Sequence, residues 1–331
     1  MANKRRMSSS ELGALWMTYQ KKTMILRILE YFIETSENKQ AKKLMNGLWK
    51  ELNPKVGVIE QLFRDEGAAV PQGFTDADVD LNAPKLFDKG FDILLCRILK
   101  EISMGLYTLH MTMSYREDII DLYTDLTKIT QKYYKEFTEY LLANGYLSVP
   151  NYVNMPNSIN FITDKNYTKG FSLVGNKRGL NTIEFSYLFN SIQTNAVGLQ
   201  LITGFAQTAQ NQEVQKYMLN GKKLCKEIIK GTEEILVDSD ILPSAINGIA
   251  ITKSNIPPFS DKMAVYLIFL LSNFGLGGQG FGAGFSLRDD INLKLFVYAK
   301  DIYQFIREGI KVMIDNGWME EPPKMDVNGL K

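Results

Sequence analysis

The feature that most limits what this chain can fold into is an internal duplication. When the sequence is shifted by 172 or 173 residues against itself, identical residues meet along most of its length. The matches pair Glu11 with Glu184, Gln20 with Gln193, Phe32 with Phe205, Asn38 with Asn211, Phe87 with Phe259 and Gly145 with Gly317, and the run Ser114, Arg116, Asp118, Ile119 with Ser286, Arg288, Asp290, Ile291. Each half is therefore expected to form one structural unit.

The periodicity within each half is helical. Apolar residues recur at spacings of three, four and seven, which places them on one stripe of a helix. The stripe consists of Leu12, Leu15, Trp16, Tyr19, Leu26, Leu29 and Ile33 in the first half, and of Leu188, Ile192, Leu199, Ile202 and Phe205 in the second. Further helices are predicted over about 38–66, 84–113 and 115–144, with a kink at Pro54 and ends at Gly67 and Gly145. We find no alternation typical of β-strands.

Four long helices with one apolar face each predict a four-helix bundle. The long connection between the second and third helices, about 67–83 with its copy at 238–258, is the ferritin-like connectivity. We therefore predict an all-α protein, a tandem duplication of a ferritin-like four-helix bundle with a long crossover between helices 2 and 3. The first bundle is expected at 1–150, a linker at 151–179 and the second bundle at 180–331.

Such a fold raises the question of a di-iron centre, and the sequence argues against one. That centre needs a Glu from each of two helices and a Glu-x-x-His from each of the other two. His110 is the only His of the chain, and Tyr107 rather than Glu stands three residues before it. Gln20 and Gln193 at the mid-bundle positions are neutral amides. We expect no metal, no cofactor and no catalytic residue, and we expect His110 to be a hydrogen-bonded core residue.

Two kinds of acidic motif also have structural interpretations. Glu11 follows Ser8, and Glu184 follows Asn181, at the spacing of a capping box that begins a helix. Asp76, Asp78, Asp80 and Asn82 resemble the opening of a calcium loop, but Leu81 and Phe87 stand where that loop needs Gly and Glu. We expect Asp76 to cap a short turn and the acidic side chains to face solvent.

Residues 263–287 carry no charge and are long enough to cross a bilayer. Six glycines between 275 and 284 interrupt the apolar character of this segment. We therefore predict that it is the most buried helix of the second bundle and does not span a membrane. These glycines cost about 5–6 kcal/mol of helix propensity relative to alanine. Gly275, Gly278 and Gly282 are therefore predicted to form a close-packing face, a broken helix, or a pocket for an apolar small molecule.

Composition narrows the function further. The net charge of +1 disfavours a nucleic-acid binder. Ser8 to Glu11 stand where the apolar part of an export signal would begin, so cytoplasmic synthesis without a signal peptide is expected. Cys96 and Cys225 are expected to be buried free thiols.

Five segments together resemble the domain of unknown function 3231 family of endospore-forming bacteria. They are residues 71–87 (PQGFTDADVDLNAPKLF), 179–184 (GLNTIE), 258–262 (PFSDK), 286–290 (SLRDD) and 316–323 (NGWMEEPP). The resemblance extends from about residue 8 to 323. It implies a ferritin-like bundle without a di-iron site and a similarity to spore coat protein F, and it implies no catalytic residues.

The sequence therefore favours a non-enzymatic structural or interaction protein, with protein partners or self-association, located in the spore coat. The alternative is a helical binding module that holds an apolar small molecule or a lipid near residues 275–284. A metalloenzyme that uses carboxylates alone is a third, minor hypothesis.

Overall fold

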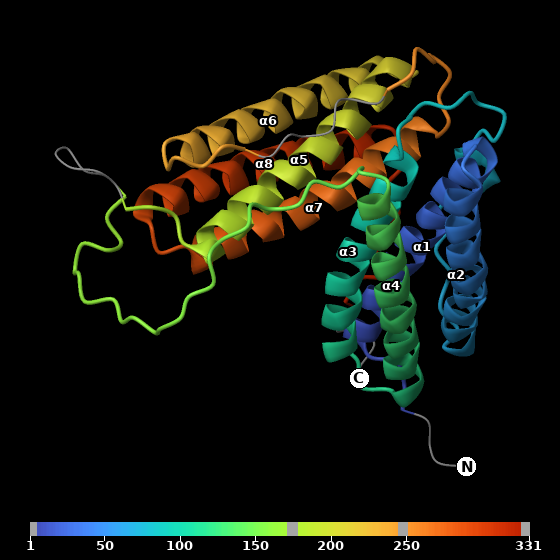
Figure 1. Cartoon of the computed structure of the whole chain (residues 1–331). Helices are drawn as coiled ribbons and strands as arrows, with labels where there is room; N and C mark the ends of the chain where they lie inside the picture. The colour runs from blue at the N-terminus through green and yellow to red at the C-terminus, as the bar shows by residue number, and fades with distance from the viewer. Residues whose placement is uncertain (1–4, 171–177, 244–250, 326–331) are drawn as a thin grey trace. The chain divides into compact units, whose positions relative to one another are not determined.

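The computed structural model describes residues 5–170, 178–243 and 251–325. This part of the chain contains eight α-helices, one short 3-10 turn and no β-strand (Figure 1). The helices are α1 (Ser9–Thr35), α2 (Lys39–Asp65), α3 (Phe91–Thr112), α4 (Glu117–Ala143), α5 (Thr182–Thr208), α6 (Gln212–Val237), α7 (Asp261–Phe285) and α8 (Asp289–Asp315). The prediction of an all-α protein with two sets of four helices is confirmed.

The helices form two compact units. The first unit consists of Met1–Tyr146, Thr252–Ala264 and Met313–Lys331, and the second of Leu147–Ile251 and Val265–Val312. Residues 151–170 carry no helix. The two units are nevertheless not separated at one point of the chain within 151–179. The reason lies in the crossover of the second repeat, because residues 252–264 group with the first unit.

Helix pairs are the building blocks of both units. In the first unit α1 packs along α2 and α3 along α4, while α2 also contacts α4. In the second unit α5 packs along α6. A cluster of buried apolar side chains forms the core of the second unit, made of Leu188, Ile192, Ile228, Leu236, Ala283, Ile291, Leu295, Tyr298, Ile302 and Ile306.

The helix ends follow the sequence signals. Ser8 with Glu11, and Asn181 with Glu184, form complete capping boxes at the starts of α1 and α5. Gly67 and Gly145 end α2 and α4 with left-handed φ angles of 67° and 68°. The equivalent of Gly67 after α6 is Asp240, which adopts the same conformation with φ of 58°. The predicted helix caps are therefore confirmed.

The start of α3 differs from the prediction. The sequence pattern predicts a helix from about residue 84, but α3 begins at Phe91. Lys89 and Gly90 have φ angles of 52° and 76°, and a right-handed helix cannot pass through residues in that conformation. Pro54, by contrast, lies inside the continuous helix α2.

The crossover between α2 and α3 is an ordered part of the first unit. Tyr31 on α1 donates its hydroxyl to the carbonyl of Pro84 at 2.8 Å and accepts from the backbone N–H of Leu86 at 2.9 Å. The crossover also bonds to residues 252–260, where the backbone N–H of Thr252 donates to the carbonyl of Leu86 and a single bridge joins Val79 to Phe259.

Candidate functional site

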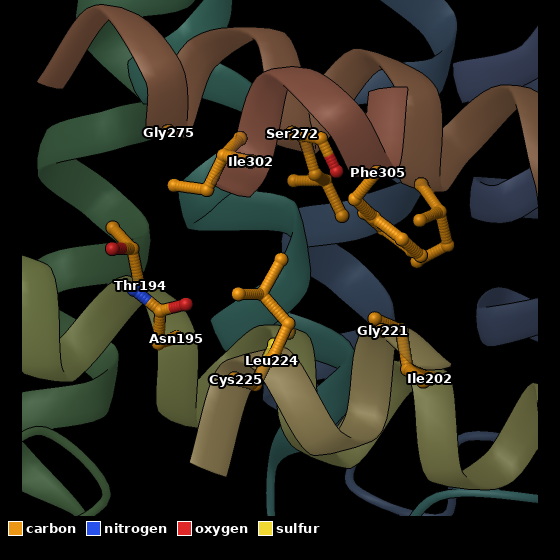
Figure 2. Close-up of a pocket in the computed structure, with 13 residues that line it drawn as sticks. Thr194, Asn195, Ile202, Gly221, Leu224, Cys225, Ser272, Gly275, Ile302 and Phe305 are labelled. Atoms are coloured by element: carbon orange, nitrogen blue, oxygen red, sulfur yellow. The ribbon is translucent and has the colours of Figure 1, made fainter. Parts of the chain in front are cut away.

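A small cavity lies among the helices of the second unit (Figure 2). Its volume is about 70 Å³, and it is partly open to solvent. In Figure 2 the side chains of Thr194, Leu224 and Ile302 point into the same space. The lining residues are Thr194, Asn195, Gly198, Ile202, Gly221, Leu224, Cys225, Ile268, Leu271, Ser272, Gly275, Ile302 and Phe305. A cavity of this size can hold a few water molecules or one very small ligand.

The wall of the cavity is apolar apart from a few groups. The side chains of Thr194 and Asn195 each donate a hydrogen bond to a backbone carbonyl of α5, at 2.9 and 2.8 Å. Burial raises the pKa of the Cys225 thiol to about 12, so this thiol is protonated at neutral pH. Gly221 is required by packing, because a Cβ there would lie 2.4 Å from the ring of Phe305. Such a wall suits an apolar ligand better than a charged one.

The three glycines singled out in the sequence have different surroundings. Gly275 lines this cavity and also a smaller one of about 20 Å³, and Gly278 lines only the smaller one. Gly282 lines neither of them. A Cβ at Gly282 would lie 2.9 Å from Cδ1 of Leu295 and 3.3 Å from Cβ of Tyr187, so this glycine alone of the three allows close packing. The hypothesis of a broken helix is wrong, since α7 is continuous through all three positions.

Helix α7 is less buried than predicted. Gly277, Gly280, Phe281 and Phe285 are exposed, and one third of the most apolar 18-residue window of α7 is buried. The length and the apolar composition of α7 would suffice for a bilayer span. The expectation that this segment is the most buried helix of the second bundle is therefore wrong for the second half of α7.

The equivalent interior of the first unit is filled by three lysines. Lys21, Lys22 and Lys100 correspond in the repeat to Thr194, Asn195 and Ser272 of the cavity wall. All three side chains are at most 2% exposed. We call them the lysine cluster. The sequence pattern does not predict their burial, because lysine side chains usually lie on the surface.

Two members of the lysine cluster, Lys21 and Lys22, lie against Tyr107. The Nζ of Lys22 donates to the Tyr107 hydroxyl at 3.1 Å, and the Nζ of Lys21 lies 3.9 Å from the centre of the Tyr107 ring. The Nζ atoms of Lys21 and Lys100 have no hydrogen-bond partner. Burial, with repulsion from Lys100, holds the pKa values of Lys21 and Lys22 well below the usual value, and burial lowers the pKa of Lys100 to about 8.

His110 lies at the next turn of α3 beyond Tyr107. It is buried, and its Nδ1 is 3.1 Å from the hydroxyl of Thr18, which also contacts the Tyr123 hydroxyl at 3.2 Å. Burial and the charge of Lys21 lower the pKa of His110 to about 4, so the ring is neutral at neutral pH. The prediction of a hydrogen-bonded core histidine is confirmed.

No arrangement suited to a metal ion is found in the described ranges. Within them no group of three or more His, Cys, Asp or Glu side chains comes together. The mid-bundle amide Gln193 donates instead to the carbonyl of Ser148 at 2.8 Å.

The acidic turn differs from its prediction. Thr75, not Asp76, caps the turn Asp76–Asp78, and Asp78 completes a capping box with it. Asp78 is buried and accepts a hydrogen bond from the Ser260 hydroxyl at 2.7 Å, so it does not face solvent. Asp76 is exposed and pairs with Arg27.

The repeated glutamates anchor the loop between the third and fourth helices of each repeat. Glu11 accepts from the backbone N–H groups of Tyr115 and Arg116, each at 2.7 Å. Glu184 accepts from the N–H of Leu287 at 3.0 Å and from the two terminal guanidinium nitrogens of Arg178. Their structural role is confirmed.

Comparison with known proteins places the chain in a family. A model of the family described as "Protein of unknown function (DUF3231)" matches residues 1–159 and 168–329. A solved structure described as a "putative spore coat protein" from Bacillus halodurans C-125 is similar, with 19% identity and a TM-score of 0.42, covering 45% of this chain and 97% of that chain. No curated protein matches. Since the family match covers nearly all residues, the resemblance seen in the sequence is confirmed, and the chain belongs to the DUF3231 family of proteins of unknown function.

Proposed function

We propose that this protein is a non-enzymatic structural or interaction protein that associates with copies of itself through the second unit. One observation carries the proposal, namely an apolar stripe on the outer face of α8. Leu293, Phe296, Val297 and Tyr303 recur at helical spacing, and each is between 45% and 60% exposed. Contiguous apolar side chains on a surface are typical of protein interfaces.

The first repeat provides the contrast. The residues that correspond to the apolar stripe lie on α4 and are Asp121, Thr124, Asp125 and Gln131. Their side chains are polar, so the helical fold itself does not require apolar groups at these positions. The stripe is a property of the second repeat alone, which supports a role in association.

Restoring the polar residues of the first repeat tests this proposal. A variant with Leu293→Asp, Phe296→Thr, Val297→Asp and Tyr303→Gln should sediment as a monomer, whereas the unchanged chain should form a dimer or larger species. A matched control removes exposed apolar groups from the first unit, with Leu109→Thr and Tyr115→Ser, and should associate like the unchanged chain. A monomeric unchanged chain at all concentrations up to its solubility limit would overturn self-association.

The family resemblance supports the spore coat as the location. A fluorescent fusion expressed from the native promoter in a sporulating host should collect at the spore surface, and the protein should be recovered in the coat extract. Diffuse fluorescence in the mother cell and absence from the coat extract would contradict this location.

The cavity supports a second candidate function, the binding of a very small apolar molecule. Cys225 lines the cavity, whereas Cys96 is 1% exposed in the first unit and lines neither of the two cavities described above, which gives an internal control. A small thiol reagent at mildly alkaline pH should label Cys225 faster than Cys96. Saturation with a small apolar probe such as benzene should slow labelling at Cys225 only. Equal labelling with and without the probe would argue against this function.

A further inference from the structure

The lysine cluster places three amines in the interior of the first unit without a counter-charge. Lys21 and Lys22 come from α1 and Lys100 from α3, and Lys100 interacts electrostatically with both of the others. Isolated buried charges are very unfavourable, and an amine in such a place must lose its proton or gain an anionic partner.

Two carboxylates on the helices of this unit have partners outside the cluster, and a third, Asp92 on α3, is partly buried and acts on Cys96. Glu51 on α2 accepts from Lys132 and from the Tyr133 hydroxyl, and Glu101 on α3 pairs with Arg97. Lys55 on α2, Cys96 on α3 and the lysines themselves are the groups whose charges act on the cluster. In the described part of the first unit, no carboxylate is among them.

Several hydrogen-bond donors of the cluster lack an acceptor. The Nζ atoms of Lys21 and Lys100 are fully buried and have no partner, and the same holds for the Thr130 hydroxyl on α4. The repeat shows that Thr130 belongs to the same level of the bundle, because its counterpart Ile302 lines the cavity together with the counterparts of the three lysines. A buried donor without an acceptor costs about 1–3 kcal/mol, so unsatisfied donors from three helices call for an acceptor.

We propose that Lys21, Lys22 and Lys100, with the hydroxyls of Tyr107 and Thr130, form an internal binding site for one small oxyanion of the carboxylate or phosphate class. The oxyanion accepts hydrogen bonds from the two unpartnered ammonium groups and supplies the missing negative charge. Lysine is suited to this role because its ammonium group is a compact point charge with three donors on a flexible stem.

The bound oxyanion also changes the protonation of the cluster. Without it, burial and mutual repulsion favour the neutral amines, whereas a negative charge at the centre favours the ammonium forms. Binding therefore takes up protons, and it should weaken as the pH rises above about 8, where Lys100 loses its proton without an anion. A purely structural cluster would not show an anion dependence of this kind.

Because the cluster is closed to solvent, the test loads the oxyanion during refolding. The full chain is unfolded in urea, refolded in HEPES buffer that contains phosphate, acetate or neither, and desalted, and the anion released on renewed unfolding is measured by ion chromatography. We expect one anion per chain from either the phosphate or the acetate sample, together with a higher melting temperature than in the anion-free sample. The amount of anion retained per chain should fall between pH 7 and pH 9.

Two variants complete the experiment. Lys21→Met with Lys100→Met removes the unpartnered amines and should retain no anion, while its melting temperature should not respond to phosphate or acetate. Lys135→Met with Lys223→Met makes the same charge change at exposed positions and should behave like the unchanged chain. Absence of retained phosphate and acetate in the unchanged chain, or equal retention in the Lys21→Met, Lys100→Met variant, would overturn the proposal.

Discussion

The two repeats use the same interior level in opposite ways. In the second unit short side chains, Thr194, Asn195 and Ser272, leave a cavity of about 70 Å³. In the first unit the lysine cluster occupies the equivalent positions and its amines are sealed from solvent. Both arrangements fit between helices of nearly equal length. The comparison teaches that the helix frame of this fold does not determine the chemistry of its interior.

What the repeats share lies at the ends of the helices instead. Arg116 and Arg288 follow the third helix of their repeats, are almost completely buried, and each forms a two-pronged pair with the aspartate two residues later. Their remaining partners differ, because Arg116 pairs with Glu66 whereas Arg288 donates to the Ser239 hydroxyl and the carbonyl of Arg178. Both repeats therefore contain this buried arginine paired with an aspartate, which we call the arginine clamp, whereas the side chains of their interiors differ.

The largest expected effect concerns these arginines. Arg288→Ala should lower the free energy of unfolding by about 3–5 kcal/mol, because it leaves the largely buried Asp290 without its partner. Arg116→Ala should cost less, because water can reach its partners Asp118 and Glu66. Urea unfolding followed by circular dichroism measures the loss. Arg64→Ala, at an exposed pair, is the control and should cost less than about 1 kcal/mol. If the substitution of either buried arginine also cost less than about 1 kcal/mol, the arginine clamp would not stabilise both repeats.

A smaller effect of opposite sign is expected at the lysine cluster. In HEPES buffer without added oxyanion, Lys100→Met should raise the free energy of unfolding at pH 7 by about 1–3 kcal/mol, since an apolar side chain of similar volume replaces an amine without a partner. The reverse change in the second unit, Ser272→Lys, should destabilise. Chemical unfolding of both variants decides the matter, and a destabilising Lys100→Met would mean that the amine has a favourable partner.

The gain from Lys100→Met should also depend on pH. Since the pKa of Lys100 is lowered to about 8 from its unfolded value of 10.5, the unfolded chain binds the extra proton between these values, and the stability of the unchanged chain rises with pH there. Deprotonation of Tyr31, whose pKa is raised to about 12, opposes this above pH 10 in both proteins. The difference between variant and unchanged chain should therefore be largest below pH 8 and shrink towards pH 9.5. A constant difference would contradict a titrating Lys100.

The helices and most of their ends could be predicted from the sequence, because the signals for them are local. Apolar spacing, capping boxes such as Ser8 with Glu11, and terminal glycines such as Gly145 act within one or two turns of a helix. The start of α3 was missed because its cause, the positive φ angles of Lys89 and Gly90, has no signature in the apolar pattern.

The interior chemistry could not be predicted in the same way. Lysines usually lie on the surface, so Lys21 and Lys22 were assigned to no core position. The middle of α1 is buried on nearly all sides, which a stripe of apolar residues does not reveal. The repeat held a signal, because the lysines align with Thr194 and Asn195, which lie in a helix whose single charged residue is Glu184.

The smallest predicted effect separates the glycines of α7 by their surroundings. Gly277 and Gly280 are exposed, with no neighbouring atom within 4 Å of a Cβ, and the counterpart of Gly280 in the first repeat is Thr108. Gly277→Ala and Gly280→Ala should therefore each stabilise the second unit by about 0.5–1 kcal/mol through helix propensity. Gly282→Ala should gain less or destabilise, because Leu295 must move. Thermal unfolding of the three variants measures the difference. Equal gains at all three positions would show that α7 does not pack closely at Gly282, and no gain at Gly277 and Gly280 would show that these exposed glycines serve contacts outside the chain.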